Sequence, residues 1–152
     1  MRVQHGAFVL VTDGCKALFL RNEGDSEFPD LRLVEKWNQS VPADHELRSG
    51  APGHAFSSHD HGTRRSAYEE TDFHDQAEVE FASKAAEYLN DQLRPHAIQE
   101  LIIVAPPRTL SVLRKHLRRE VLDRVTAEIA KDLVKHPIRA IERLLAGYRE
   151  PV

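Results

Sequence analysis

The chain has 152 residues, a formal net charge of −3 and a single cysteine, Cys15. This length predicts one α/β domain over residues 1–152, able to bury about two thirds of its unfolded surface without a metal. One cysteine excludes an internal disulfide, and its position in an apolar run predicts a small buried thiol in a reducing compartment. Charges interrupt the apolar N-terminal residues, so we expect neither a signal peptide nor a membrane span, and a cytoplasmic location.

The net charge conceals a basic C-terminal third. Between Arg108 and Arg149 there are 11 basic residues (Lys or Arg) and 5 acidic residues (Asp or Glu). Residues 1–107 contain 10 basic and 18 acidic residues. Such a surplus can bind phosphates, nucleic acid or an acidic partner. A solvated helix face is an equally good explanation, because no aromatic side chains are interleaved with these charges.

Three strands are predicted at the start of the chain. Residues 7–12 and 16–20 are apolar and rich in strand-forming residues, and Asp13-Gly14 between them predicts a hairpin whose glycine supplies a positive φ. Residues 31–37 alternate, which predicts a third strand and an antiparallel meander. One face of this third strand would consist of Leu31, Leu33, Glu35 and Trp37.

Residues 38–67 cannot supply a hydrophobic core. Gly, Pro, Ser, Asp, His and Arg dominate there, which is typical of a mobile or ligand-ordered loop. A loop of this length is uncommon inside a compact domain, so it is either functional or evidence against the assignment.

Helices and strands then alternate. Asp72 can cap a helix from about His74 to Leu93, with acidic residues near its positive end. Residues 101–105 are continuously apolar, which predicts a central strand covered on both faces. The apolar stripe of the helix is Ala77, Phe81, Ala85, Tyr88 and Leu89.

The last part of the chain predicts a short basic helix, a strand and a terminal helix. In the strand, Val125, Ala127 and Ile129 would share one face, and Pro137 would start the terminal helix. The whole order, β-β-β, long loop, α-β-α-β-α, predicts a mixed five-stranded sheet of the ribonuclease H-like kind. The outer side of the basic helix would present Arg114, Lys115, Arg118 and Arg119.

Residues 7–19 resemble the opening hairpin of the middle domain of archaeal and eukaryotic peptide-chain release factors and of Pelota, and residues 101–108 resemble its fourth strand. Residues 126–137 are similar to bacterial proteins described as required for attachment to host cells. The resemblance extends from about His5 to Gly147. It implies a domain suited to contact with the ribosome or structured RNA, and a regulatory or translational role that affects attachment indirectly.

In release factors the long loop after the third strand contains a Gly-Gly-Gln tripeptide that supports hydrolysis of peptidyl-tRNA. Residues 49–54 of this chain are Ser-Gly-Ala-Pro-Gly-His, with neither paired glycines nor a following glutamine. Peptide release is therefore not expected, and the resemblance implies a non-catalytic domain.

The loop and the basic helix together supply the predicted contact residues. Arginine can bind phosphate through two hydrogen bonds, and a loop rich in His and Arg can become ordered on RNA. A solvated hinge is the competing explanation for the loop. The predicted RNA- or partner-binding residues are His54, His59, His61, Arg64, Arg65, Arg114, Lys115, Arg118 and Arg119.

A divalent metal is the only cofactor that the sequence suggests. His59, Asp60 and His61 have the ligand types for one, in a loop that could also be merely polar. Asp13 resembles the metal-binding Asp in the first strand of ribonuclease H. Residues 101–105 contain no acid, so a nuclease site is incomplete and Asp13 is better explained as a turn residue. The acids that could join it are Glu78 or Glu80 of the helix, and Asp132 near the end of the last strand.

Three hypotheses remain. The first, which we favour, is a non-catalytic release-factor-like domain that binds ribosomal or other structured RNA in a salt-sensitive way. The second is a protein-interaction module that regulates attachment. The third is a metal-dependent hydrolase or nuclease, whose activity would depend on His59 or Asp13.

Overall fold

The computed structural model describes residues 1–39, 63–92 and 99–149, with residues 63–74 described by their backbone alone. The elements agree with the predicted order and add one short helix, α5. They are β1 (Phe8–Thr12), β2 (Lys16–Asn22), β3 (Leu31–Asn38), α3 (Thr63–Gln92), β4 (Leu101–Val104), α4 (Pro107–His116), α5 (Arg119–Leu122), β5 (Val125–Ile129) and α6 (Ile138–Gly147).

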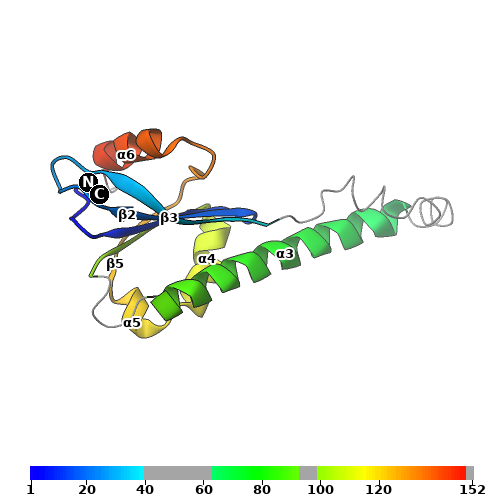
Figure 1. Ribbon diagram of the computed structural model, residues 1–152. Helices are drawn as coiled ribbons and strands as arrows, with labels where there is room; N and C mark the ends of the chain where they lie inside the picture. Colours follow the sequence, from blue (N-terminus) through cyan, green and yellow to red (C-terminus); the bar gives the residue numbers. More distant parts are fainter. Residues whose placement is uncertain (40–62, 93–98, 150–152) are drawn as a thin grey trace.

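The strands form one mixed sheet in the order β3-β2-β1-β4-β5. The first three pair antiparallel, and β4 lies parallel between β1 and β5. Figure 1 shows α6 on one face of the sheet and α3, α4 and α5 on the other. The predicted α/β class and the mixed five-stranded sheet are therefore confirmed.

Each face of the sheet has its own apolar core. Leu10 and Phe19 pack under α3, whereas Val9 and Leu20 pack under α6. Because β1 and β4 are covered on both faces, all their residues are buried, which explains their continuous apolar sequences. The predicted stripe of α3 is confirmed: Phe81, Ala85 and Leu89 are buried, with Ala82 and Ala86 beside them.

Irregular pairing in two strands overturns the predicted faces. In β3 the partners shift at Val34, so that Leu31 lies in the core under α6 while Trp37 packs against the core under α3. In β5 the shift at Thr126 separates Val125 from Ala127 in the same way. Strict alternation fails because an extra residue in one strand reverses the faces beyond it.

The predicted hairpin between β1 and β2 is present, but the reason given for its glycine is wrong. Among the described residues only Gly6 has a positive φ, 78°. Gly14 is instead needed for space, because a Cβ there would lie 2.4 Å from the Cγ of Glu78. Cys15, predicted to be buried, is exposed in the turn.

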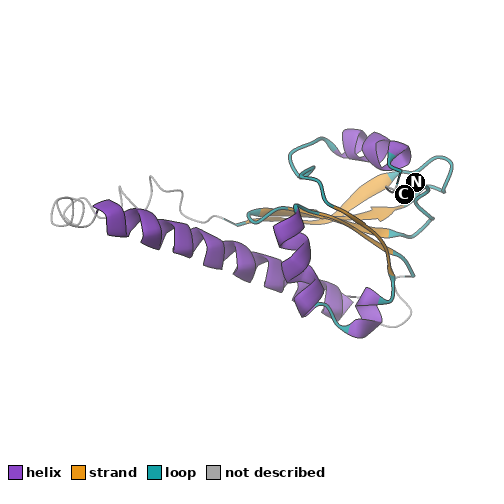
Figure 2. Ribbon diagram, turned by 180° about the vertical axis from the view of Figure 1, so that it is seen from behind, coloured by secondary structure: helices purple, strands orange, loops and turns teal. Residues whose placement is uncertain are grey.

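Helix α3 begins at Thr63, not near His74, so part of the predicted loop is helical and Asp72 lies within the helix rather than at its cap. Residues 63–92 contain neither Gly nor Pro, so nothing interrupts the helix. Figures 1 and 2 show its N-terminal half projecting beyond the sheet. Apolar periodicity could not predict this half, because periodicity marks only a helix face that packs.

The predicted basic helix is divided. Helix α4 ends at His116, and Leu117 follows with an extended backbone and a buried side chain. Arg118 is then the N-cap of α5. Across the described residues, no helix is long and apolar enough to cross a membrane.

Candidate functional site

The carboxyl ends of β1, β3 and β4 meet at one edge of the sheet, here called the carboxyl edge. The carboxylate of Asp13 accepts hydrogen bonds from the backbone N–H groups of Cys15 and Lys16, both at 2.7 Å. Its Oδ1 therefore holds the turn, as the sequence interpretation predicted. Although Cys15 is exposed, partial loss of hydration, followed by the nearby charges of Asp13 and Glu78, raises the pKa of its thiol, which opposes formation of a reactive thiolate.

The charges at the carboxyl edge are used within the protein. Arg108 at the start of α4 forms an ion pair of 3.1 Å with Asp75 on α3. Gln39 at the end of β3 donates its backbone N–H to the carbonyl of Cys15 at 2.7 Å. With its side-chain nitrogen facing inward, Gln39 also donates to the carbonyls of Ala77 and Gly14, at 3.3 and 3.2 Å. Gln39 is thereby fixed to α3 and to the β1–β2 turn.

The second cluster is a basic turn, defined here as Lys115, Arg118 and Arg119, which lies where α4 passes into α5. All three side chains are exposed, and none forms an ion pair within the described part of the chain. Arg114 differs, because its Nε donates to Glu128 Oε2 at 2.7 Å. Of the four predicted cations on this surface, one is therefore neutralised and three are available to a partner.

Asn90 near the end of α3 fixes the backbone of the basic turn. Its side-chain nitrogen donates to the carbonyl of His116 at 3.0 Å, and its side-chain oxygen accepts from the N–H of Arg118 at 2.9 Å. These bonds satisfy backbone groups on both sides of Leu117, at the point where the helix is broken. The charged turn and the long helix α3 are therefore joined through Asn90.

The structure does not describe the side chains of the remaining predicted site residues. His54, His59, Asp60 and His61 lie outside the described residues. Arg64 and Arg65 belong to the first turn of α3, and their side chains are outside the description. Among the described residues, no group of three or more His, Cys, Asp or Glu could hold a metal ion.

Sequence reasoning missed the two residues that organise the basic surface. Asn90 follows the apolar stripe of α3 as an isolated polar residue, and Glu128 belongs to a strand 14 residues from Arg114. No local pattern predicts either contact, because each depends on how distant elements pack.

The fold and this site define an α/β domain with a meander, a long helix across one face of the sheet, and a basic turn at the far end of that helix. The chain belongs to the bacterial archaeo-eukaryotic release factor family 12, whose model matches residues 6–145. An uncharacterized protein of Rickettsia prowazekii (strain Madrid E) is 49% identical over 45 residues, which are 30% of this chain and 30% of that protein. The predicted relation to release factors is confirmed, and the predicted relation to host-attachment proteins stays a prediction.

Proposed function

We propose that this protein is a non-catalytic member of its family that binds a ribosomal or other structured-RNA surface. The observation that carries the proposal is the basic turn, whose three exposed cations have no ion-pair partner in the described part of a release-factor-like domain. Exposed lysines and arginines of this kind bind phosphates by displacing counterions. Because Asn90 already holds the turn, little conformational entropy is lost when it binds.

The 38–67 segment is the second proposed contact, through His54, His59, His61, Arg64 and Arg65. Thr63, at the tip of α3, lies 27 residues from Asn90, which corresponds to about 40 Å along an α-helix. Arg64 and Arg65, at this tip, are therefore separated from the basic turn by about the length of α3. A partner that touches both must be large, which favours a ribosomal particle over a short RNA.

The test is sedimentation of the tagged protein from lysate through sucrose at low and high salt. We expect comigration with ribosomal particles at low salt and loss of it at high salt. Replacing Lys115, Arg118 and Arg119 by alanine should reduce the slope of log affinity against log salt by about two to three, because each phosphate contact contributes about 0.7 to 0.9.

A matched control removes three cations elsewhere. Lys36, Arg143 and Arg149 are exposed and form no ion pair within the described residues, so their alanine variant has the same net charge as the basic-turn variant. We expect it to sediment like the parent. Equal losses in both variants would show that only net charge matters and would contradict a specific surface.

The loop is tested separately. Because Asn38 belongs to β3 and Thr63 begins α3, the deletion should spare residues 38–40 and 62–67. Ala77, which Gln39 contacts, lies 14 residues from Thr63, or about 21 Å along the helix. A Gly-Ser linker of about ten residues in place of 41–61 can span that distance. We expect weaker comigration with unchanged stability, and parent-like comigration would exclude the loop as a contact.

A protein-interaction role linked to attachment is the second candidate, and one observation favours it. Phe28, Leu33 and Val34 are 73%, 46% and 51% exposed along β3 and the turn that precedes it. A contiguous exposed apolar patch is typical of a protein contact, and these three residues come from one stretch of the chain. Partner capture that survives nuclease treatment and is lost on replacing Phe28 by serine would support this role over RNA binding.

A further inference from the structure

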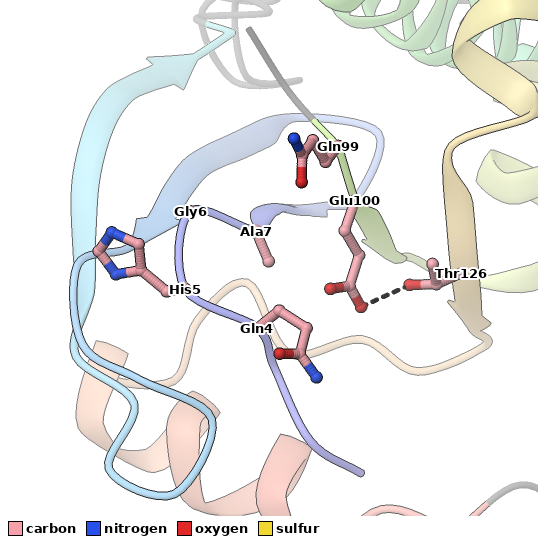
Figure 3. A pocket seen from close by; sticks show the side chains of 7 residues that line it. All are labelled: Gln4, His5, Gly6, Ala7, Gln99, Glu100 and Thr126. Atoms are coloured by element: carbon pink, nitrogen blue, oxygen red, sulfur yellow. Dashed lines mark hydrogen bonds between the residues drawn. The ribbon is translucent and has the colours of Figure 1, made fainter. Parts of the chain in front are cut away.

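A polar hollow of about 630 Å³ lies at the opposite edge of the sheet from the β1–β2 turn, where β1, β4 and β5 begin. Its volume is within the usual range for small-ligand sites. Figure 3 shows side chains of the N-terminal segment, of the residues before β4 and of β5 around it. The lining residues are Gln4, His5, Gly6, Ala7, Gln99, Glu100 and Thr126.

The N-terminal wall of the hollow is held in place by a buried asparagine. Asn22 is fully buried, and its side-chain nitrogen donates to the carbonyls of Val3 and Gln4 at 2.9 and 3.1 Å. The N–H of Gly6 donates to the carbonyl of Asn22 at 2.8 Å, with Gly6 in the left-handed region of φ. A polar side chain buried this deeply with every bond made fixes the segment that carries Gln4.

The opposite wall is shaped by the irregularity in β5. The register shift places the hydroxyl of Thr126 where it donates to Glu100 Oε1 at 2.8 Å. Bulges of this kind often redirect a side chain beside a functional site. Figure 3 shows the other carboxylate oxygen of Glu100 pointing away from Thr126, toward Ala7 and Gln4. His5 points away from the hollow, and its Nδ1 lies 2.7 Å from the carbonyl of Gly24.

Two backbone hydrogen bonds connect the hollow to the basic turn. The N–H of Leu101, next to Glu100, donates to the carbonyl of Arg124 at 2.8 Å. The N–H of Arg124 in turn donates to the carbonyl of Val121 in α5 at 3.0 Å. The carboxylate of Glu100 therefore lies at the same edge of the sheet as the cations that begin α5. The carboxylate can accept hydrogen bonds, and the cations can bind phosphate.

We propose that this hollow receives one unpaired base of a bound RNA and prefers guanine. A carboxylate only accepts hydrogen bonds, and guanine is the RNA base with two adjacent N–H donors on its Watson–Crick edge. Adenine, cytosine and uracil each present an acceptor beside a donor on this edge. Their acceptor would lie against a carboxylate oxygen, and two acceptors repel each other. The inference rests on the proposed RNA binding and adds base selectivity to it. The negative charge of Glu100 weakens binding to RNA in general, which is consistent with a role in selection rather than in affinity.

The test uses RNA hairpins of one stem sequence that carry a single unpaired G, A, U or C, together with the fully paired stem. Binding to the whole protein is measured by fluorescence anisotropy at low salt. We expect the unpaired G to bind about tenfold more tightly than the other three, as for a good pair of hydrogen bonds to one base. Glu100→Gln should abolish this preference, because an amide places a donor beside its acceptor. Because it also removes a negative charge, it should tighten binding to all the RNAs, including the paired stem, by a similar small factor.

Glu23→Gln is the matched control, since Glu23 is an exposed carboxylate in the β2–β3 turn whose backbone N–H bonds to Asp30. It should keep the preference for G, and thermal unfolding should show that both variants fold like the parent. Binding to all hairpins without preference, or a preference that survives in Glu100→Gln, would overturn this inference and leave RNA binding intact. Failure of the parent to bind any hairpin or to sediment with ribosomal particles would overturn both.

Discussion

The two edges of the sheet use charge differently. At the carboxyl edge, Asp13 holds its own turn and Arg108 pairs with Asp75. At the opposite edge, here called the amino edge, where β1, β4 and β5 begin, the cations of the basic turn have no ion pair among the described residues. There the carboxylate of Glu100 accepts a hydrogen bond of 2.8 Å from the hydroxyl of Thr126. Charges that are satisfied within the chain stabilise it locally, whereas those left over are available to a partner.

The sequence alone does not show which charges are left over, as one aspartate and one arginine demonstrate. Asp13 resembles a catalytic metal ligand but serves the turn, and Arg114 resembles a phosphate ligand but pairs with Glu128. Residue type and position alone therefore overstate the number of functional groups. The following experiments test whether the carboxyl edge is structural and the amino edge functional.

The largest effect is expected from Gly14→Ala. The new Cβ would lie 2.4 Å from Glu78 Cγ, so that α3 or the turn must move. We expect a loss of about 1–3 kcal/mol in the free energy of unfolding in urea, as in other overpacked sites. Glu78→Ala in the same chain should restore part of it, and a Gly14→Ala protein as stable as its parent would refute the close contact.

Asn90→Ala tests the connection to the amino edge. It removes both hydrogen bonds to the basic turn, at a cost of about 1–2 kcal/mol, and leaves the backbone of the turn less constrained. We expect weaker sedimentation with ribosomal particles even at temperatures where the protein is folded. Asn90→Asp keeps the acceptor for the N–H of Arg118, so its sedimentation with ribosomal particles should lie between that of the parent and that of Asn90→Ala. Full binding by Asn90→Ala would show that the turn needs no support.

Asp75→Asn should have a much smaller effect. The side chains of Arg108 and Asp75 are 63% and 40% exposed, and ion pairs at such exposure contribute little. The urea midpoint should remain within experimental error of the parent value. A clear destabilisation would mean that the ion pair, rather than the contact of Glu78 with Gly14, holds α3 at the carboxyl edge.

The last effect is confined to high pH and concerns Tyr88, in the part of α3 between the two edges. Burial and a hydrogen bond with Glu35 raise the pKa of Tyr88 to about 12. A pKa above the unfolded value of about 10 stabilises the fold below pH 10, and this contribution is lost as the pH rises toward 12. Between pH 10 and pH 12, the free energy of unfolding in urea should therefore fall more for the wild type than for Tyr88→Phe. An equal fall in the two proteins would contradict a raised pKa of Tyr88.

The sequence predicts those parts of the fold that local patterns determine. The apolar runs of β1 and β4 and the stripe around Phe81, Ala85 and Leu89 identified buried elements, because each buried face repeats with the period of its own strand or helix. The family resemblance and the element order then predicted the sheet. The start of α3 escaped prediction because its projecting half has no such stripe.

The site was less predictable for a related reason. Lys115, Arg118 and Arg119 stand out as basic residues, but only the packing of α3 against α4 and of α4 beside β5 decides which cations are neutralised. The same holds for Thr126 and Glu100, which are 26 residues apart and meet through a register shift. Contacts between distant elements are not encoded in spacing along the chain.

The register shift at Val34 also affects how molecules of this protein meet one another in solution. An edge strand with a regular ladder can pair with the edge of a second molecule, and repetition of that pairing leads to fibres. In β3 the extra residue falls near the middle of the strand, between charged neighbours Arg32 and Glu35. This irregularity interrupts the template for intermolecular strand pairing. Leu33 and Val34 are therefore exposed on a strand that offers a second molecule no regular ladder along its full length.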